Sequence, residues 1–259
     1  MARPSDLVYR LYERRLAGQV TAAPLPRHVG VILDGNRRFA RERGMDDPNL
    51  GHLAGARKIE EFLDWCWELG VQHVTLWLLS TDNLDRDATE VSGLLRIIED
   101  TVLRIAHHPK ARERRLRVIA LGALDLLPEE TRRALKEADE ATAGHDQFFL
   151  QVAVGYGGRR EITDALRSLL WAKAAEGATL ERVAETLQPE DIGDHLYTTG
   201  PDPDLIIRTS GELRLSGFLL WQSAHSEFYF CDPYWPDFRR IDFLRALREF
   251  QHRQRRYGR

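Results

Sequence analysis

Residues 28–40 read HVGVILDGNRRFA, an almost continuous apolar run that ends in an aspartate, a glycine, an asparagine and two arginines. A run of this kind is typical of a strand buried on both faces of a parallel sheet. Asp, Gly and Asn are also ordinary turn formers, so this segment alone is equally consistent with a simple turn. The rest of the chain decides between the two interpretations.

Similar apolar runs alternate with longer amphipathic stretches along the chain. The expected strands are 28–34, 73–80, 116–122, 148–155, 204–210 and 227–231. Helical patterns occur at 52–69, 88–108, 128–142, 160–175 and 241–256, and Gly70 provides a helix stop. This alternation predicts a single α/β domain, residues 28–259, with a mostly parallel sheet of about six strands flanked by helices. Residues 1–27 are expected to be an N-terminal helical extension, with a helix at 5–16 that packs against the domain.

The composition excludes several classes of protein. The 259 residues are 43% hydrophobic and 30% charged, and the net charge of −3 argues against a general nucleic-acid binder. No apolar run is long enough to predict a transmembrane segment, and residues 1–16 lack the apolar core of a signal peptide. Two cysteines are too few for a disulfide framework. We therefore expect a cytoplasmic protein.

Polar and basic residues gather where the expected strands end. Residues 34–38, 80–86, 155–160 and 208–216 each follow an apolar run and supply glycines, hydroxyls, carboxylates or arginines. Ligands of open α/β sheets bind beyond the carboxyl ends of the strands. One such segment would be a turn, whereas four together indicate an anion-binding site.

The first of these segments has the chemistry of a phosphate site. Gly35 allows the backbone to approach a ligand closely, and Arg37 and Arg38 supply positive charge. Asp34 would be repelled by a phosphate unless a cation lay between them. Mg²⁺ fits that position, because it prefers one or two carboxylates together with phosphate oxygens and water. No P-loop motif occurs in the chain.

A second cluster is formed by Arg208, Arg214 and Ser216. It could be a solvated loop, but the position of Arg208 at the end of a strand favours a ligand site. Glu227 could be a surface residue at the start of a strand or a second carboxylate for the metal. The residues alone do not decide between these two roles.

Taken together, these segments resemble the cis-prenyltransferases, the family that includes undecaprenyl diphosphate synthase. The resemblance covers residues 28–258, and the order of its motifs makes it specific. The motifs are HVGVILDGNRRFA at 28–40, STDN at 80–83 followed by Arg86 and Glu90, GYGGR at 155–159, DLIIRTSGELRLSGFLLWQSAHSEFYF at 204–230, WPDF at 235–238 and RYG at 256–258. The chain departs from the family pattern at Arg37, Phe39, Leu84 and Leu213.

The resemblance implies a Mg²⁺-dependent homodimer that condenses isopentenyl diphosphate with an allylic diphosphate and forms a cis double bond. It implies that Asp34 holds Mg²⁺ and assists departure of the allylic diphosphate, and that Glu227 is the second metal carboxylate. The residues implied to bind the allylic diphosphate are Gly35, Asn36, Arg37, Arg38, Phe39 and His52. Those implied to bind isopentenyl diphosphate are Arg208, Arg214, Leu215 and Ser216, with the backbone of Gly258 reaching the site across the dimer.

The second motif is implied to lie at the reacting carbons. Its residues are Ser80, Thr81, Asp82, Asn83 and Arg86. In the family Asn83 is often assigned the removal of the proton. An amide is a poor base, and the departing diphosphate is a chemically better proton acceptor, so this role is left open.

Leu78 provides a hypothesis about product length. In long-chain members of the family the position two before the motif serine is typically small. Strand alternation places Leu78 and Ser80 on one face of the strand, so Leu78 would block the tunnel below the reacting end. We therefore expect a C15 product, (2Z,6E)-farnesyl diphosphate, from geranyl diphosphate and one isopentenyl unit. The alternative is that Leu78 only packs the core.

Two other functions are considered. One is a long-chain synthase that makes decaprenyl or undecaprenyl diphosphate. The other is a non-catalytic partner subunit, which would be expected to lack the metal carboxylate and the arginine pair. Asp34, Arg208 and Arg214 are all present, which argues against the partner subunit.

Overall fold

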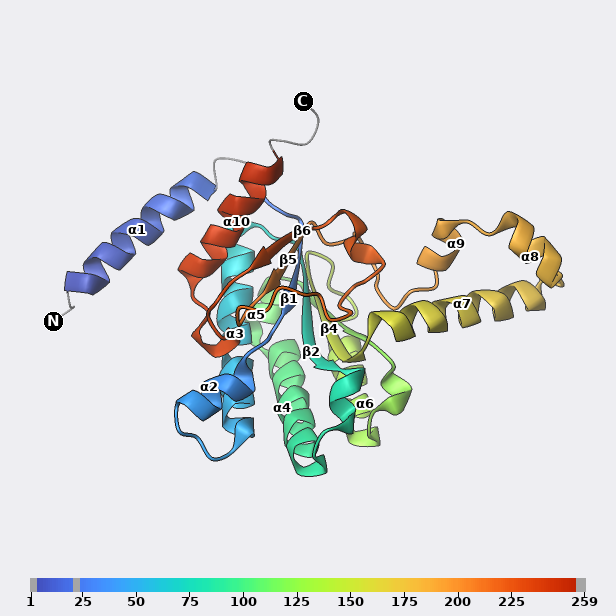
Figure 1. The fold of residues 1–259 in the computed structure, drawn as a ribbon, viewed down its shortest axis with the longest axis horizontal. Helices are drawn as coiled ribbons and strands as arrows, with labels where there is room; N and C mark the ends of the chain where they lie inside the picture. Colours follow the sequence, from blue (N-terminus) through green and yellow to red (C-terminus); the bar gives the residue numbers. More distant parts are fainter. Residues whose placement is uncertain (1–3, 21–23, 255–259) are drawn as a thin grey trace.

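Six parallel strands form one sheet (Figure 1). The structure is a computed structural model and describes residues 4–20 and 24–254. Within this part the strand order is β3-β4-β2-β1-β5-β6, and every neighbouring pair is parallel. The strands are β1 (His28–Ile32), β2 (His73–Ser80), β3 (Leu116–Leu121), β4 (Phe148–Tyr156), β5 (Leu205–Arg208) and β6 (Glu227–Phe230). The sequence prediction of a mostly parallel six-stranded sheet is confirmed.

The central strands are buried on both faces, as their continuous apolar sequences predict. Every residue of β1 and of β5 is buried. The register pairs Ile32 of β1 with Arg208 of β5. The polar residues that follow β1 therefore emerge beside the arginine that ends β5.

The longer helices follow the expected pattern with small shifts at their ends. The long helix after β1 begins at Pro48 rather than at His52, because the side chain of Asp47 caps it by accepting from the backbone N–H of Asn49. It ends at Gly70, which adopts φ 80° as a left-handed cap. The helices around the sheet are α2 (Asn36–Glu42), α3 (Pro48–Leu69), α4 (Ala88–His107), α5 (Pro109–Glu113), α6 (Glu129–Ala141) and α10 (Arg240–Gln254), with short 3₁₀ turns η1 (Thr81–Asp85), η2 (Leu124–Leu126), η3 (Gln222–His225) and η4 (Trp235–Asp237).

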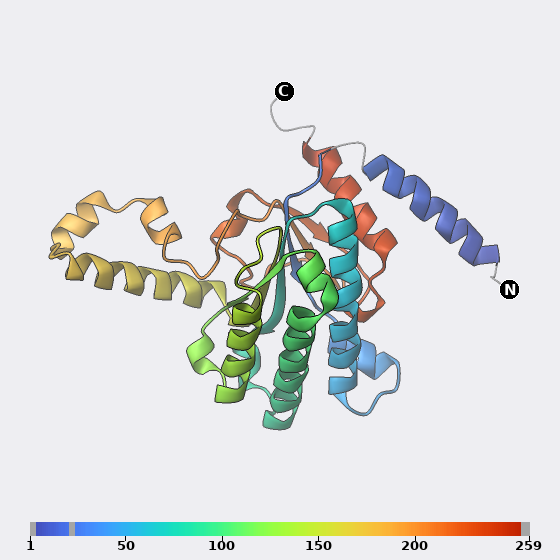
Figure 2. The same ribbon diagram turned by 180° about the vertical axis from the view of Figure 1, so that it is seen from behind.

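The two faces of the sheet are covered differently. Helices α3, α4 and α6 lie side by side over one face (Figure 2). The large core on this side includes Phe62, Trp235 and Phe243. A smaller core on the other face contains Tyr156 and Phe218 and is covered mainly by loop segments. The helical face has room between its helices for an apolar pocket, described below.

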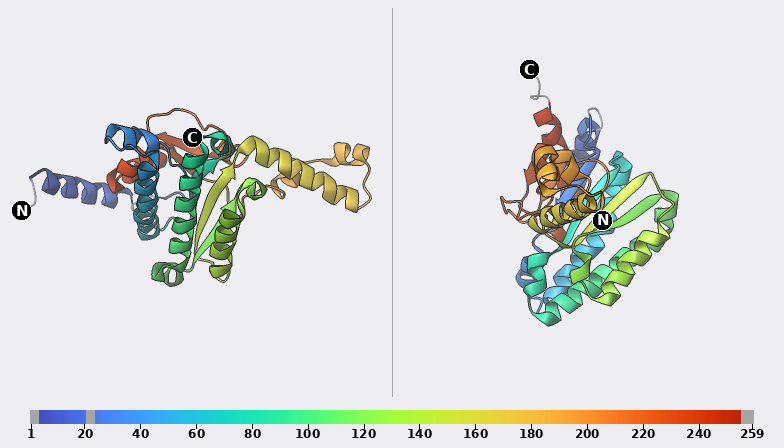
Figure 3. Two further views of the ribbon diagram at one scale, coloured as in Figure 1. Left: turned by 90° about the horizontal axis from the view of Figure 1, so that it is seen from below. Right: turned by 90° about the vertical axis from the view of Figure 1, so that its right-hand side faces the viewer.

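A helical arm projects from the body of the molecule. It consists of α7 (Gly158–Ala175), α8 (Leu180–Thr186) and α9 (Pro189–Gly193) and extends away from the sheet in both Figure 1 and Figure 3. The buried carboxylate of Glu161 ties the base of the arm to the returning chain, because it accepts from the backbone N–H of Tyr197 at 3.0 Å and from the side chain of Gln222 at 3.0 Å. Trp171 on α7 is 74% exposed.

The N-terminal helix α1 (Pro4–Val20) packs against α10, where Leu16 and Val20 are buried. The side chain of Gln251 donates to the carbonyl of Val20 at 2.6 Å and closes this contact. The helix is therefore present where the sequence predicted one, and it runs four residues further. Among the residues described, no helix combines the length and the apolar character needed to cross a bilayer.

Candidate active site

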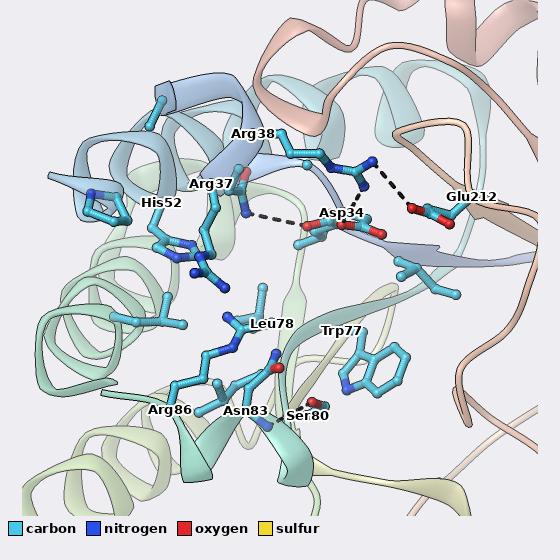
Figure 4. Close-up of a pocket in the computed structure, with 18 of the residues that line it drawn as sticks. Asp34, Arg37, Arg38, His52, Trp77, Leu78, Ser80, Asn83, Arg86 and Glu212 are labelled. Carbon is cyan, nitrogen blue, oxygen red and sulfur yellow. Dashed lines mark hydrogen bonds and ion pairs between the residues drawn. The ribbon is translucent and has the colours of Figure 1, made fainter. Parts of the chain in front are cut away.

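A large cavity opens at the carboxyl ends of β1, β2 and β5 (Figure 4). Its volume is about 950 Å³. The parallel sheet brings segments far apart in the sequence to this one edge, as expected for an open α/β fold. The predicted site residues that line the cavity are Asp34, Gly35, Asn36, Arg37, Arg38, His52, Leu78, Ser80, Asp82, Asn83, Arg86, Arg208, Arg214 and Ser216.

Gly35 turns the chain from β1 into α2. Its φ is 104°, a conformation that residues with a side chain rarely adopt. A Cβ at this position would also lie 2.5 Å from the ring of Tyr234 and 3.1 Å from Cβ of Ser210. No other residue fits here without moving its neighbours, so the glycine fixes how Asp34 and α2 enter the cavity.

Asp34 lies between two arginines. Its Oδ2 accepts from Nη2 of Arg208 at 2.7 Å, and its Oδ1 accepts from Nη2 of Arg38 at 3.3 Å. Burial alone would raise the pKa of Asp34, but the hydrogen bond and charge of Arg208 and the charge of Arg38 outweigh it, so the pKa is held below its usual value. Asp34 is therefore ionised at neutral pH.

These contacts close into a ring. Arg208 Nη1 donates to the carbonyl of Arg214 and, at 2.8 Å, to Oγ of Ser216. Nη1 of Arg214 pairs with Oε2 of Glu212, and Oε1 of Glu212 pairs with Nη1 of Arg38 at 3.3 Å. Arg38 in turn pairs with Asp34, which closes the ring. The first and the fifth strand ends thus share one network of three arginines and two carboxylates.

Two arginines and a histidine surround Glu90 at the start of α4. Oε1 of Glu90 lies 3.3 Å from Nε of Arg37, 3.5 Å from Nη1 of Arg86 and 3.8 Å from Nε2 of His52. Burial lowers the pKa of His52, and the charge of Glu90 offsets only part of that effect. The cavity therefore has one basic group around Asp34 and another around Glu90.

Ser80 and Asn83 form the corner at the end of β2. The hydroxyl of Ser80 accepts from the backbone N–H of Asn83 at 3.2 Å and caps η1. This holds the amide of Asn83 at the cavity wall, where Figure 4 shows it between Ser80 and Arg86.

An apolar pocket continues below the cavity, between α3 and α4. Leu78 lines both spaces and stands at their junction. The register between β2 and β4 shifts from Trp77 to Leu79, which marks a bulge at Leu78. The simple alternation from which we placed Leu78 beneath Ser80 is therefore interrupted, although both residues still face the same cavity.

Four predicted residues lie away from the cavity wall. Phe39 carries the guanidinium of Arg43 over its ring, at 4.9 Å, and Thr81 and Leu215 do not line the cavity. Glu227 lies at the amino end of β6, where its carboxylate pairs with Arg253 at 3.2 Å.

The distance of Glu227 from Asp34 follows from the register. Glu227 pairs with Leu205, three positions before Arg208 and therefore about 10 Å along the strand from it. One protomer does not bring Glu227 to the cavity, so a metal site shared with Asp34 would need Glu227 of a second protomer. Gly258 lies outside the described residues.

The cavity wall also contains residues that were not predicted as site residues, among them Arg41, Trp77 and Glu212. Glu212 joins Arg38 to Arg214, and its place between Arg208 and Arg214 in the sequence was the available signal. Trp77 lines the cavity and stacks on Phe218, with ring centroids 5.3 Å apart and a 12° interplanar angle. Nothing in the strand sequence distinguished Trp77 from a core residue.

The residues present fit a magnesium ion through a single carboxylate. Asp34 is ionised and exposes 28% of its side chain. Mg²⁺ commonly takes one or two carboxylates and completes its octahedron with water and phosphate oxygens. Within residues 4–20 and 24–254, no group of three or more His, Cys, Asp or Glu side chains could hold a metal by itself. Asp34 is thus the residue that would hold the ion.

This arrangement suits a substrate with a charged head and an apolar tail. Six arginines and His52 line the cavity and offer donors for phosphate oxygens. The pocket below Leu78 is lined mainly by apolar side chains, including Ile59, Leu94 and Ile98. A polyphosphate ester of a hydrocarbon would place its charged end at the arginines and direct its apolar end towards this pocket, whose volume of about 30 Å³ has to widen before it holds a tail.

Comparisons with known proteins agree with this geometry. The profile of the family described as "Putative undecaprenyl diphosphate synthase" matches residues 32–258. The chain is 62% identical to a (2Z,6E)-farnesyl diphosphate synthase of Thermobifida fusca over 252 residues, which cover 97% of each chain. It is 52% identical to a short-chain Z-isoprenyl diphosphate synthase of Mycobacterium leprae over 259 residues, 99% of this chain and 97% of the other.

A solved structure shows the same fold. The crystal structure of lavandulyl diphosphate synthase from Lavandula x intermedia, in complex with dimethylallyl diphosphate, superimposes with a TM-score of 0.79 at 33% identity. The match covers 90% of this chain and 96% of that chain.

Proposed function

The chain belongs to the undecaprenyl diphosphate synthase family of cis-prenyltransferases, and we propose that it joins isopentenyl diphosphate to geranyl diphosphate to give (2Z,6E)-farnesyl diphosphate. In this reaction C1 of the allylic substrate bonds to C4 of isopentenyl diphosphate. The allylic C1–O bond breaks, diphosphate leaves, and one proton is lost from C2 of the former isopentenyl unit. The ring that joins Asp34 to Arg38 and Arg208 above an apolar pocket is the observation that carries the proposal.

The allylic diphosphate binds at the start of α2 in this proposal. Arg37, Arg38, Arg86 and His52 converge on this side of the cavity, and Gly35 and Asn36 bring the backbone close. Breaking the allylic bond transfers negative charge to the diphosphate. Arginines already fixed by the fold stabilise that charge as it develops. Phe39 lies away from the cavity wall, against the guanidinium of Arg43, and has no place among these diphosphate ligands.

Isopentenyl diphosphate binds at the end of β5. Arg208, Arg214 and Ser216 offer three side chains to its diphosphate. Arg208 is only 5% exposed and is held by Asp34 and Ser216, so its orientation is set before a substrate arrives. Leu215 does not line the cavity but packs against the smaller core, between two residues that do line it.

A bound Mg²⁺ supplies electrophilic stabilisation of the departing diphosphate. Asp34 would hold the ion, and the lowered pKa keeps its carboxylate charged across the neutral range. Ser80, Thr81 and Asp82 form the corner at the end of β2. From this corner the side chain of Asn83 orients the reacting carbons. The proton goes to the departing diphosphate rather than to the Asn83 amide, because an amide is a poor base.

A short product is favoured over a long one. Leu78 stands where the hydrocarbon tail would leave the cavity, and the relatives from Thermobifida fusca and Mycobacterium leprae are named as farnesyl and short-chain synthases. The long-chain alternative gains no comparable support. The non-catalytic alternative is disfavoured because Asp34, Arg208 and Arg214 are present and joined in one network.

We include a homodimer in the proposal. The projecting arm exposes Trp171 and Leu180, at 74% and 69%, and large exposed apolar side chains often mark an interface. A second copy of the chain would cover them. Sedimentation of the wild type and of Trp171→Glu tests this: the variant should dissociate at concentrations where the wild type is a dimer.

The proposal also covers the domain organisation of the chain and its location in the cell. Residues 1–27 are a helical extension of the catalytic domain, residues 28–259, supported by the contact of α1 with α10. A cytoplasmic location is supported by the two buried free thiols, Cys66 and Cys231.

The decisive experiment is an assay of the purified chain with isopentenyl diphosphate, Mg²⁺ and, in turn, dimethylallyl, geranyl or farnesyl diphosphate. Chromatography should show a C15 product that depends on geranyl diphosphate and Mg²⁺. A matched reaction with a chelator should show none. Products of C50 or C55 would replace this proposal with the long-chain alternative, and the lack of any condensation would contradict it entirely.

A further inference from the structure

Glu212 links the two basic segments of the cavity. Its Oε1 lies 3.3 Å from Nη1 of Arg38 on α2 (Figure 4). Its Oε2 pairs with Nη1 of Arg214 in the loop after β5. The carboxylate is 29% exposed and lines the cavity. It therefore occupies donors of two arginines that, in the proposed function, serve different substrates.

The loop that carries Glu212 is held in a strained shape. Ser210 and Ser216 have φ values of 78° and 53°, although neither is glycine. Such conformations persist only where surrounding contacts impose them. One of these contacts is the 2.6 Å hydrogen bond from Nη2 of Arg38 to Oγ of Ser210. The strained loop thus holds Glu212 beside Arg38 and Arg214. An unrestrained surface side chain would instead turn away from these arginines into solvent.

A diphosphate that binds here must compete with this carboxylate. Both are anions that accept from the same N–H groups, and Nη1 of Arg38 and Nη1 of Arg214 are already in use. Repulsion between the two anions adds to the competition. We propose that Glu212 is an internal competitor of diphosphate, which holds Arg38 and Arg214 when the site is empty and takes them back as diphosphate leaves.

This inference rests on the proposed function, since it concerns the same diphosphate sites. Its test is the affinity for inorganic diphosphate, measured by calorimetry without metal at fixed pH and ionic strength. Glu212→Gln should bind diphosphate more tightly than the wild type by roughly 3- to 30-fold, the range expected for losing two partly exposed ion pairs. Glu212→Asp keeps the charge and should stay close to the wild type.

Asp46→Asn is the matched control. Asp46 lines the same cavity and carries the same charge, but it makes no ion pair within the part of the chain that the structure describes. Its removal should change the affinity less than twofold if contact with the arginines, rather than overall charge, causes the competition. An equal tightening in Asp46→Asn would overturn the role of Glu212.

A kinetic measurement provides a second test of the role of Glu212. The inhibition constant of diphosphate as a product should fall in Glu212→Gln by the same factor as the dissociation constant, with an unchanged thermal unfolding curve. Unchanged or weaker diphosphate binding in Glu212→Gln would show that Glu212 only positions the arginines and would refute the proposal. A wild type that binds no diphosphate at all would instead count against the proposed function, so the two failures are distinct.

Discussion

Nη2 of Arg208 lies 2.7 Å from Oδ2 of Asp34 and joins the ends of β5 and β1 across the sheet. The two residues are far apart in the sequence, and the parallel register of β1 and β5 alone brings them together. Arg208 is almost fully buried, whereas Asp34 is partly open to the cavity. The pair therefore has one member fixed by the core and one available to a ligand.

The first prediction concerns this aspartate. Asp34→Ala should lower kcat by ~10²–10³-fold or more, because it removes the carboxylate that holds the metal and orients Arg208. Asp34→Asn is the matched variant, since it keeps an acceptor for Arg208 but loses the charge. Both variants should remain folded by circular dichroism. A folded Asp34→Ala enzyme with nearly normal turnover would rule out the assigned role.

The second prediction separates the two diphosphate sites. Arg214→Ala should raise the KM for isopentenyl diphosphate and leave the KM for the allylic substrate nearly unchanged, at a loss of roughly 1.5–3 kcal/mol in binding. Arg208→Ala should do the same and should also lower kcat, because Arg208 contacts Asp34 directly. Arg132→Ala, which removes a surface arginine of α6 paired only with Glu129 in the described structure, is the control. A rise confined to the allylic KM would mean that the two sites are exchanged.

The strand ends explain how much of this site the sequence could predict. Apolar runs located all six strands to within two residues at each end, and Gly70 marked a helix end correctly. The residues at four strand ends could then be assigned to one edge, because parallel strands all end there. Three of these segments line the cavity, whereas residues 155–160 after β4 do not. The contacts among those residues could not be predicted, since they depend on strand order and register.

Glu212 and Glu227 are two examples of contacts that could not be predicted from the sequence. Both are carboxylates near the fifth and sixth strands, and their distances from Asp34 could not be predicted from the sequence. The register places Glu227 at the amino end of β6, and the turn after β5 brings Glu212 into the ring with Arg38. The bulge at Leu78 was equally hidden, because the apolar run of β2 continues through it without a glycine or proline.

The third prediction concerns the C-terminal segment, which lies outside the described residues. Deleting residues 256–259 should reduce turnover by roughly 10²-fold, as expected when a positioned donor to the diphosphate is lost. The dimer should persist in sedimentation, because the projecting arm remains intact. Deleting Arg259 alone, which keeps Gly258, should have little effect. Unchanged kinetics in the longer deletion would refute a role of Gly258 in the neighbouring site.

The fourth prediction concerns the pH dependence of stability. His28 is buried at the amino end of β1, with Nδ1 donating to the carbonyl of Pro201 at 2.7 Å and Nε2 lying 2.8 Å from the hydroxyl of Thr75. Burial lowers the pKa of His28 from 6.5 to about 4, although the hydrogen bond to the carbonyl of Pro201 and the charge of Asp204 act in the opposite direction. Between these two values the unfolded chain binds a proton that the folded chain does not.

Because of this difference in proton binding, His28 should make the folded protein less stable as the pH falls. Above pH 6.5 His28 is neutral in both states, and as the pH falls towards 4 the free energy of unfolding should decrease by up to about 3 kcal/mol from this residue. Urea denaturation at several pH values should show that this part of the slope is missing in His28→Gln. The exposed His252→Gln should keep the wild-type slope, and a parallel slope in His28→Gln would contradict the assignment.

The last prediction tests whether Leu78 limits product length. Leu78 is only partly buried, and it lines both the polar cavity and the apolar pocket below it. Leu78→Ala should open a path between them, so that a longer tail fills the space left by the leucine. Each additional buried CH₂ then contributes roughly 0.8 kcal/mol to retention of the longer product. Products analysed by chromatography should shift from C15 to C20 and longer, with only a modest fall in the unfolding temperature.

Leu76→Ala is the matched control, because Leu76 lies on the same strand, is fully buried and lines neither space. A plain core residue of this kind should cost about 2–5 kcal/mol of stability on truncation and leave the C15 product unchanged. If Leu78→Ala behaves like Leu76→Ala, Leu78 is part of the core and the limit on chain length lies elsewhere. If Leu78→Ala instead changes the product while keeping most of its stability, the junction at the bulge of β2 sets the length of the chain.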